Sequence, residues 1–248
     1  MSIKIDKLKL SKPAINIFQQ TQNIILDDLS IEFQLNGFHL IIGESGAGKT
    51  TFLRCLYTLE KYDSGNITIN NIDIINFQDK IKFLFQFNGE LLNPFRLVSS
   101  MLKDSLMKND ISNYQIESIV NKYLDEFNLD RNILFKKGYQ LSGGEHQRIA
   151  LIRLLLTEPN ILLLDEPFSS QDFQADQIIA ENLIRLNKEN KMTIICVSHN
   201  LVNIINHVDT IAVLHQGKIL EFGNRELVLS NPKEELTKNL LGKYLAEP

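Results

Sequence analysis

The run GESGAGKT at residues 43–50 constrains this 248-residue chain more than any other feature. It matches the pattern Gly-x4-Gly-Lys-Thr and lies between FHLII, which is typical of a buried strand, and the helix-forming run TFLRCLYTL. In this setting the loop amides wrap phosphate groups, the lysine reaches the β- and γ-phosphates, and the threonine hydroxyl coordinates Mg²⁺. A glycine-rich turn without a ligand is the structural alternative. We expect ATP or GTP to bind here, with phosphate contacts from Gly43, Glu44, Ser45, Gly46, Ala47, Gly48, Lys49, Thr50 and Thr51.

A pair of acidic residues supplies the second requirement of a phosphate-transfer site. The run ILLLDEP (161–167) has the aliphatic character of a strand that is covered on both faces, and its aliphatic part leads into Asp165 and Glu166. A carboxylate at such a strand end holds Mg²⁺ in nucleotide-hydrolysing proteins, so Asp165 is a candidate for that role. Glu166 is a candidate to orient and deprotonate an attacking water molecule. Two solvated acids at a strand end are the alternative.

The first part of the chain is expected to form strands. Residues 1–10 and 23–35 alternate between apolar and polar side chains, and the second run ends at Asn36-Gly37, a strong hairpin signal. The run NITINNIDI (66–74) predicts a further hairpin in the same antiparallel layer, and KFLFQF (82–87) predicts an apolar strand. We expect the hairpin runs to form one antiparallel layer, and the buried strand at 38–42 to lead into the phosphate loop.

The rest of the chain alternates between helices and strands. Residues from about Pro94 to Ile133 have helical spacing, with a capping box expected at Ser112 and Gln115, and we expect a helical lobe over 88–138. A helix over 145–157 precedes the strand at 161–165. A helix over about 173–188, a strand at 192–198, a helix to about His207 and a strand at 210–215 then follow. This alternation predicts a mainly parallel sheet.

Composition and charge argue against binding to nucleic acid or anionic lipid, against a membrane span and against secretion. The net charge is −4, so no basic face for nucleic acid or anionic lipid is expected. No apolar run approaches the ~20 residues of a membrane span, and the opening MSIKIDKLKL does not read as a secretory signal. Cys55 and Cys196 lie in apolar contexts that favour burial over a disulfide. We expect a reduced, cytosolic protein.

Taken together, the motifs resemble those of the ATP-binding cassette (ABC) ATPases. GESGAGKT, Gln86, LSGGEHQR (141–148), ILLLDEP, SSQD (169–172) and His199 occur in that family's order and spacing over nearly the whole chain. The resemblance implies an α/β P-loop NTPase fold of ABC type, with a mainly parallel core sheet, an antiparallel β subdomain and a helical subdomain. It implies one nucleotide-binding domain over 1–248, with the catalytic core and β subdomain at about 1–87 and 139–248 and the helical subdomain at about 88–138.

The resemblance also implies a role for each matching residue. Gln86 would contact Mg²⁺ beside Thr50 and Asp165, and would act in catalysis with Glu166 and His199. Ser142, Gly143, Gly144 and Glu145 would form the signature that contacts ATP bound to a second subunit, and Asp172 would couple the two sites. Phe18 is the candidate for stacking on adenine. Taken singly, Gln86 can be a polar strand end, Asp172 a helix N-cap and His199 a strand-end histidine.

The family resemblance further implies a transport function that uses ATP and Mg²⁺. Leu92-Asn93-Pro94 has the spacing seen in the peptide, nickel and metal-chelate branch of importers. We therefore expect an ATPase subunit that powers uptake of a small solute from the cytoplasmic face of the cell membrane, as a peripheral protein. Its expected partners are transmembrane permease subunits, a second identical or different ATPase subunit and an extracellular solute-binding protein, but no nucleic acid. An exporter subunit and a non-transport ATP-driven clamp are the alternatives.

Overall fold

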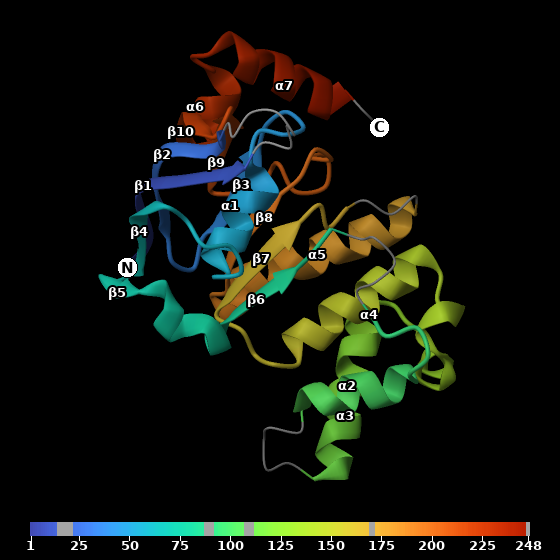
Figure 1. The fold of residues 1–248 in the computed structure, drawn as a ribbon. Helices are drawn as coiled ribbons and strands as arrows, with labels where there is room; N and C mark the ends of the chain where they lie inside the picture. Colours follow the sequence, from blue (N-terminus) through green and yellow to red (C-terminus); the bar gives the residue numbers. More distant parts are fainter. Residues whose placement is uncertain (14–21, 87–91, 107–111, 169–171, 247–248) are drawn as a thin grey trace.

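The computed structural model describes residues 1–13, 22–86, 92–106, 112–168 and 172–246 (Figure 1). Two sheets organise these residues. The first is antiparallel and has the order β2 (Gln22–Gln34), β1 (Ser2–Pro13), β4 (Ser64–Ile69), β5 (Ile72–Asp73). The second has the order β10 (Lys218–Asn224), β9 (Thr210–His215), β3 (Phe38–Ile42), β8 (Thr193–Val197), β7 (Ile161–Asp165), β6 (Ile81–Leu84). In this core sheet only the β9–β10 pair is antiparallel among the described strands, so the expectation of a mainly parallel sheet is confirmed.

The strands β3, β7 and β8 are aliphatic because both of their faces are covered. Every residue of these three strands is buried. Their side chains alternate between two cores, so that Leu40 and Ile42 join the core on one face while Ile41 joins the core on the other. Because the three strands run parallel, their carboxyl ends meet at one edge of the sheet. That edge is where the chain places its polar motifs.

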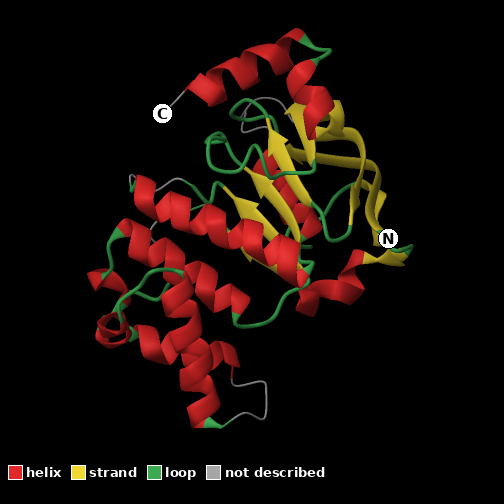
Figure 2. Ribbon diagram, turned by 180° about the vertical axis from the view of Figure 1, so that it is seen from behind, coloured by secondary structure: helices red, strands yellow, loops and turns green. Residues whose placement is uncertain are grey.

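Helices cover the two faces of the core sheet unequally. Helix α1 (Lys49–Leu56) lies on the face shared with the antiparallel sheet, where its Phe52 and Leu53 are buried. On the opposite face, α5 (Phe173–Asn190) buries Ile179 and Leu183 against the core strands, and α4 (Gly143–Leu155) lies beside it. Figure 2 shows the long helix α5 in front of the strands when the molecule is seen from behind. The core sheet is therefore enclosed between a β layer and a helical layer.

A group of helices lies in sequence between β6 and α4. It consists of α2 (Val98–Leu106), α3 (Asn113–Glu126) and the short 3₁₀ helices η2 (Arg131–Phe135) and η3 (Gly138–Gln140). Helix α2 packs against both α3 and α4, and the group projects away from the two sheets (Figure 1). The capping box predicted at Ser112 and Gln115 is confirmed at the start of α3. A further 3₁₀ helix, η1 (Ile74–Lys80), follows β5.

The last two described helices lie at the far edge of the core sheet. These are α6 (Arg225–Ser230), which follows β10, and α7 (Glu235–Ala246). Leu240, Leu241 and Tyr244 of α7 are buried in the helical-face core. Within the described part of the chain, no helix is both long enough and apolar enough to cross a membrane.

The hairpin expected at Asn36-Gly37 is wrong. The turn is present, with Asn36 at φ 66°, but β2 pairs with β1 while β3 lies between β8 and β9 in the other sheet. Asp209 accepts a hydrogen bond from the amide of Phe38 at 2.7 Å, and Gly37 accepts one from the amide of Ile194 at 2.9 Å. The turn therefore leads the chain from the antiparallel sheet into the core sheet. There β3 pairs with two parallel strands, which it could not do if it formed a hairpin with β2.

The helix expected to end at about His207 is also wrong. Residues 202–207 form successive turns, with hydrogen bonds from the amides of Ile204 and Ile205 to the carbonyl of Leu201 at 3.0 and 2.9 Å. The side chains of Leu201, Ile204 and Ile205 are all buried. The apolar spacing of this segment therefore reflects packing against the core. This packing stabilises the turns although they do not form a continuous helix.

Candidate active site

A cleft of about 560 Å³ opens at the carboxyl edge of the core sheet. It brings together residues from the loop after β3, the ends of β6, β7 and β8, and the last described helix. The lining residues are Ile25, Gly43, Ser45, Gly46, Gly48, Lys49, Thr50, Thr51, Gln86, Asp165, Glu166, Val197, His199, Lys243 and Tyr244. Motifs far apart in the sequence thus share one cavity.

The loop between β3 and α1 needs glycine at two points. Gly48 has φ 102° and directly precedes α1, in a conformation that side-chain-bearing residues rarely adopt. A Cβ atom on Gly43 would lie 2.2 Å from the carbonyl oxygen of Leu214 on the neighbouring strand. The loop can therefore hold its close-packed path only without side chains at these positions, and this path ends at a helix N-terminus, where backbone amides favour an anion.

Lys49 binds oxygen atoms of its own loop. Its ammonium group donates hydrogen bonds to the carbonyls of Gly43 at 2.7 Å and Glu44 at 2.9 Å. Burial lowers the pKa of Lys49, and the negative charges of Glu166 and Asp165 oppose that shift. The ammonium is thus held at the wall of the cleft, where phosphate oxygens can replace the two carbonyls.

Asp165 offers a carboxylate with one oxygen unsatisfied. The residue is 2% exposed, and the Thr50 hydroxyl donates a hydrogen bond to its side chain. Burial raises the pKa of Asp165, and the charge of Glu166 acts in the same direction. Its Oδ1 is buried and has no hydrogen-bond partner among the described residues. A hydroxyl and a buried carboxylate oxygen are ligands that Mg²⁺ prefers, so these two residues fit that ion.

Glu166 is fixed against His199. Its Oε2 lies 2.8 Å from His199 Nδ1 and accepts a hydrogen bond from the His199 backbone amide at 3.2 Å. Glu166 has φ 51°, an uncommon conformation for a residue with a side chain, and its own amide donates to the carbonyl of Val197 at 2.9 Å. Strained backbone of this kind concentrates at functional sites. The arrangement holds a carboxylate that can accept a proton at the wall of the cleft.

Gln86 lies two residues beyond the end of β6, where its exposed side chain lines the same cleft. The structure therefore brings Gln86, Lys49, Thr50, Asp165, Glu166 and His199 together. Phe18 lies outside the described residues, so adenine stacking by this residue stays a prediction. Ser169, Ser170 and Gln171 of the SSQD run also lie outside them.

The signature residues are not among those that line the cleft, and they lie at the start of α4. Ser142 caps this helix, and its side chain accepts a hydrogen bond from the amide of Glu145 at 3.2 Å. Glu145 in turn accepts from the amide of Ser142 at 2.9 Å and pairs with Lys136 at 2.9 Å. The helix expected over 145–157 thus begins two residues early, at Gly143, because the capping box fixes its first turn. Glu145 supports the helix end of its own chain.

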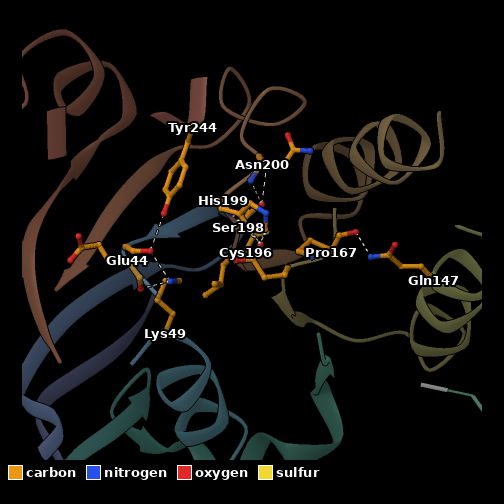
Figure 3. A network of polar contacts seen from close by, with 12 residues as sticks. Glu44, Lys49, Gln147, Pro167, Cys196, Ser198, His199, Asn200 and Tyr244 are labelled. Carbon is orange, nitrogen blue, oxygen red and sulfur yellow. Dashed lines mark hydrogen bonds and ion pairs between the residues drawn. The ribbon is translucent and has the colours of Figure 1, made fainter. Parts of the chain in front are cut away.

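Asp172 caps α5 next to the same helix end. Its Oδ1 accepts a hydrogen bond from the amide of Ala175 at 3.1 Å. A Cβ atom on Gly144 would lie 2.9 Å from Asp172 Oδ2 and 2.8 Å from Ala175 Cβ, so the two helix N-termini touch. The side-chain amide of Gln147 on α4 donates to the carbonyl of Pro167, one residue beyond Glu166 (Figure 3). This hydrogen bond links α4, which begins with the signature residues, to the segment that directly follows the acidic pair of the same chain.

Apart from Val197, which ends the strand β8, three residues that line the cleft had no signal in the sequence. Ile25 comes from β2, and Lys243 and Tyr244 come from α7. The Tyr244 hydroxyl donates a hydrogen bond to the carbonyl of Gly43 at 3.1 Å. No local pattern marks these positions, because only the tertiary structure brings α7 to the loop.

The fold and the cleft together define a P-loop nucleotide-binding protein. A family profile described as ABC transporter matches residues 26–169, and the chain belongs to this family. The core sheet, the antiparallel sheet and the cleft at the strand ends are the architecture expected for an ABC-type cassette, so the predicted fold class is confirmed.

Individual relatives agree with this assignment. The chain is 31% identical over 221 residues to the spermidine/putrescine import ATP-binding protein PotA of Treponema pallidum, covering 89% of this chain and 58% of that protein. It is 34% identical over 215 residues to a methionine import ATP-binding protein, MetN 1, of Bacillus cereus, covering 83% of this chain and 61% of that protein. The chain thus spans about three fifths of the length of these relatives.

A solved structure extends the likeness to three dimensions. The dimeric structure of MJ0796, a bacterial ABC transporter cassette, superposes with a TM-score of 0.79 at 25% identity, covering 90% of this chain and 98% of that one. The arrangement of strands and helices described above is therefore that of a cassette of this family.

Proposed function

We propose that this chain is the ATP-hydrolysing subunit of an ABC importer for a small solute. The observation that carries the proposal is the meeting of Lys49, Glu166 and His199 in one cleft, although they follow three different strands. In this reading the chain is one nucleotide-binding domain, with a helical subdomain at about 88–138 and the catalytic core and β subdomain in the remainder.

The side chains in the cleft suit hydrolysis of ATP. Lys49 would exchange its two loop carbonyls for β- and γ-phosphate oxygens. Water would attack the γ-phosphorus, the bond to the bridging oxygen would break with its electrons leaving on ADP, and Glu166 would accept the proton of the water. His199 would hold Glu166 in place and contact the γ-phosphate.

Mg²⁺ would be held by Thr50, Asp165 and Gln86. When bound, the ion neutralises the charge of the phosphate oxygens. The unsatisfied Oδ1 of Asp165 is the feature of this chain that supports the assignment.

The cleft lacks the signature residues of its own chain, which supports action as a dimer. Ser142, Gly143 and Gly144 stand at the N-terminus of α4, outside that cleft. They would contact the γ-phosphate of ATP bound to a second subunit, identical or different, through backbone donors at the helix end. Asp172 caps α5 beside Gly144 and would couple the two sites.

The transported solute and the membrane partners are the finer part of the proposal. The relatives described above are named for spermidine/putrescine and methionine import, so they support import without selecting a substrate. Leu92-Asn93-Pro94 is the feature that favours the peptide, nickel and metal-chelate branch. Separate permease subunits and an extracellular solute-binding protein would complete the transporter, with this chain peripheral at the cytoplasmic face of the membrane.

The test is the substitution Glu166→Gln, which removes the proton acceptor and keeps the shape of the side chain. We expect ATP turnover to fall by about 10²–10⁴-fold, while ATP still binds and closed dimers accumulate. In the presence of Mg²⁺-ATP, phosphate release measures turnover, and light scattering measures the accumulation of dimers. Glu117→Gln, on the exposed face of α3, is the matched control. Turnover at the wild-type rate in Glu166→Gln would contradict the assigned role.

A further inference from the structure

Helix α7 places a tyrosine against the phosphate loop. Tyr244 is 7% exposed, and its hydroxyl donates to the carbonyl of Gly43 at 3.1 Å across a sequence separation of 201 residues. Figure 3 shows the side chain pointing from α7 toward the loop that carries Glu44 and Lys49. The contact is therefore directed at the first residue of the phosphate-binding run.

Tyr244 and Lys49 share one acceptor. The carbonyl of Gly43 accepts from the Lys49 ammonium at 2.7 Å as well as from the Tyr244 hydroxyl. A carbonyl oxygen has two lone pairs, so both donors are accommodated at once. Gly43 is itself buried, so an unpaired carbonyl there would carry the full cost of lost hydration.

The same side chain reaches the other half of the site. The ring of Tyr244 lies 6.4 Å from the ring of His199, centroid to centroid, at an interplanar angle of 60°. His199 in turn contacts Glu166. Tyr244 thus lies against both the loop that holds Lys49 and the histidine that fixes the proposed proton acceptor.

We propose that Tyr244 is a positioning residue of the nucleotide site. The inference rests on the proposed ATP binding at Lys49. When phosphate draws the Lys49 ammonium away from Gly43, the Tyr244 hydroxyl remains as the donor that satisfies this carbonyl. Tyr244 therefore stabilises the nucleotide-bound loop more than the empty one, since in the empty loop Lys49 also serves the carbonyl.

The test is Tyr244→Phe, which removes the hydroxyl and keeps the ring beside His199. Calorimetry with Mg²⁺ and a non-hydrolysable ATP analogue measures affinity, and thermal unfolding without nucleotide measures the empty state. We expect the Kd to rise at least about fivefold, while the Tm without nucleotide changes by no more than about 3 °C. Tyr114→Phe, which removes an exposed tyrosine hydroxyl on α3, is the matched control and should change neither value.

The possible outcomes distinguish a failure of the role of Tyr244 from a failure of the proposed ATP binding. Failure of the unsubstituted protein to bind the analogue would overturn the proposed function. Binding by the unsubstituted protein with an unchanged Kd in Tyr244→Phe would overturn only the role of Tyr244. A large fall in Tm without nucleotide would also overturn that role, because it would show that the hydroxyl stabilises the fold in both states.

Discussion

His39 shows how far the fold controls the chemistry of a single side chain. It is 1% exposed on β3, with Nε2 2.7 Å from the carbonyl of Gln34 and Nδ1 2.8 Å from the hydroxyl of Thr210. A carbonyl can only accept, so Nε2 carries the proton and Nδ1 accepts from Thr210. Burial lowers the pKa of His39, against the opposing effects of the Gln34 carbonyl and the charge of Asp209.

This pKa shift predicts a loss of stability in acid. The unfolded chain takes up a proton near pH 6.5, while folded His39 resists protonation, so the free energy of unfolding falls as the pH drops below that value. The loss at pH 5.5 is at most about 1.4 kcal/mol. Urea unfolding at pH 7.5 and 5.5 measures it, and His39→Gln should lose less stability between the two than the unsubstituted chain. Exposed His207→Gln is the control and should keep the full dependence.

At the scale of elements, the start of α4 combines two glycines with different surroundings. A Cβ atom on Gly143 would meet nothing within 4 Å, whereas one on Gly144 would press on Ala175 and Asp172 of α5. Gly144 therefore serves the packing of two helices within the chain. Gly143 leaves an open approach to the helix end, which the proposed contact with a second subunit's nucleotide would need.

The two glycines should respond differently to substitution. Gly143→Val should leave the Tm and ATP binding unchanged and lower turnover by about 10²-fold, because the side chain would obstruct the approach of the partner's phosphate. Gly144→Ala should lower stability by about 1–3 kcal/mol through overpacking, seen as a fall in Tm. Thermal unfolding and phosphate release measure both variants. Normal turnover in Gly143→Val would contradict the role of this helix end in a shared site.

At the scale of the whole molecule, the proposed transport function needs a surface for the membrane subunits. Phe95 is 78% exposed shortly before α2, and the neighbouring Arg96 is paired with Asp104 at 2.6 Å. If the chain docks on a permease as proposed, we expect this exposed aromatic side chain, beside an ion pair, to contact a cytoplasmic helix of that permease. Asp104 belongs to α2, and the helical group that contains α2 lies away from the antiparallel sheet (Figure 1).

Phe95→Asp should release the chain from the membrane while sparing its own chemistry. We expect the fraction that sediments with membranes of the native cells to fall at least about tenfold, because a buried unpaired charge at an interface is strongly unfavourable. ATP binding should be unchanged. Tyr114→Asp, on the exposed face of α3, is the control. Sedimentation of Phe95→Asp at the unsubstituted level would contradict the docking role and favour a clamp that acts without a permease.

Local sequence patterns were enough to predict which polar residues meet in the cleft. Lys49, Asp165, Glu166 and His199 each lie at or shortly after the end of an aliphatic strand, and parallel strands bring such ends to one edge of a sheet. Local patterns were therefore enough to predict where these residues lie. The hairpin predicted at Asn36-Gly37 was wrong, because a turn dipeptide does not determine which sheet the next strand joins.

The residues that complete the cleft from distant parts of the chain are known only from the folded structure. Tyr244 meets Gly43 across 201 residues, and Ile25 enters from a strand of the other sheet. It also placed Gly144 against Asp172, which makes this glycine a packing requirement. These contacts depend on how layers and helices distant in sequence pack, and packing is a property of the whole folded chain that no short stretch of residues carries.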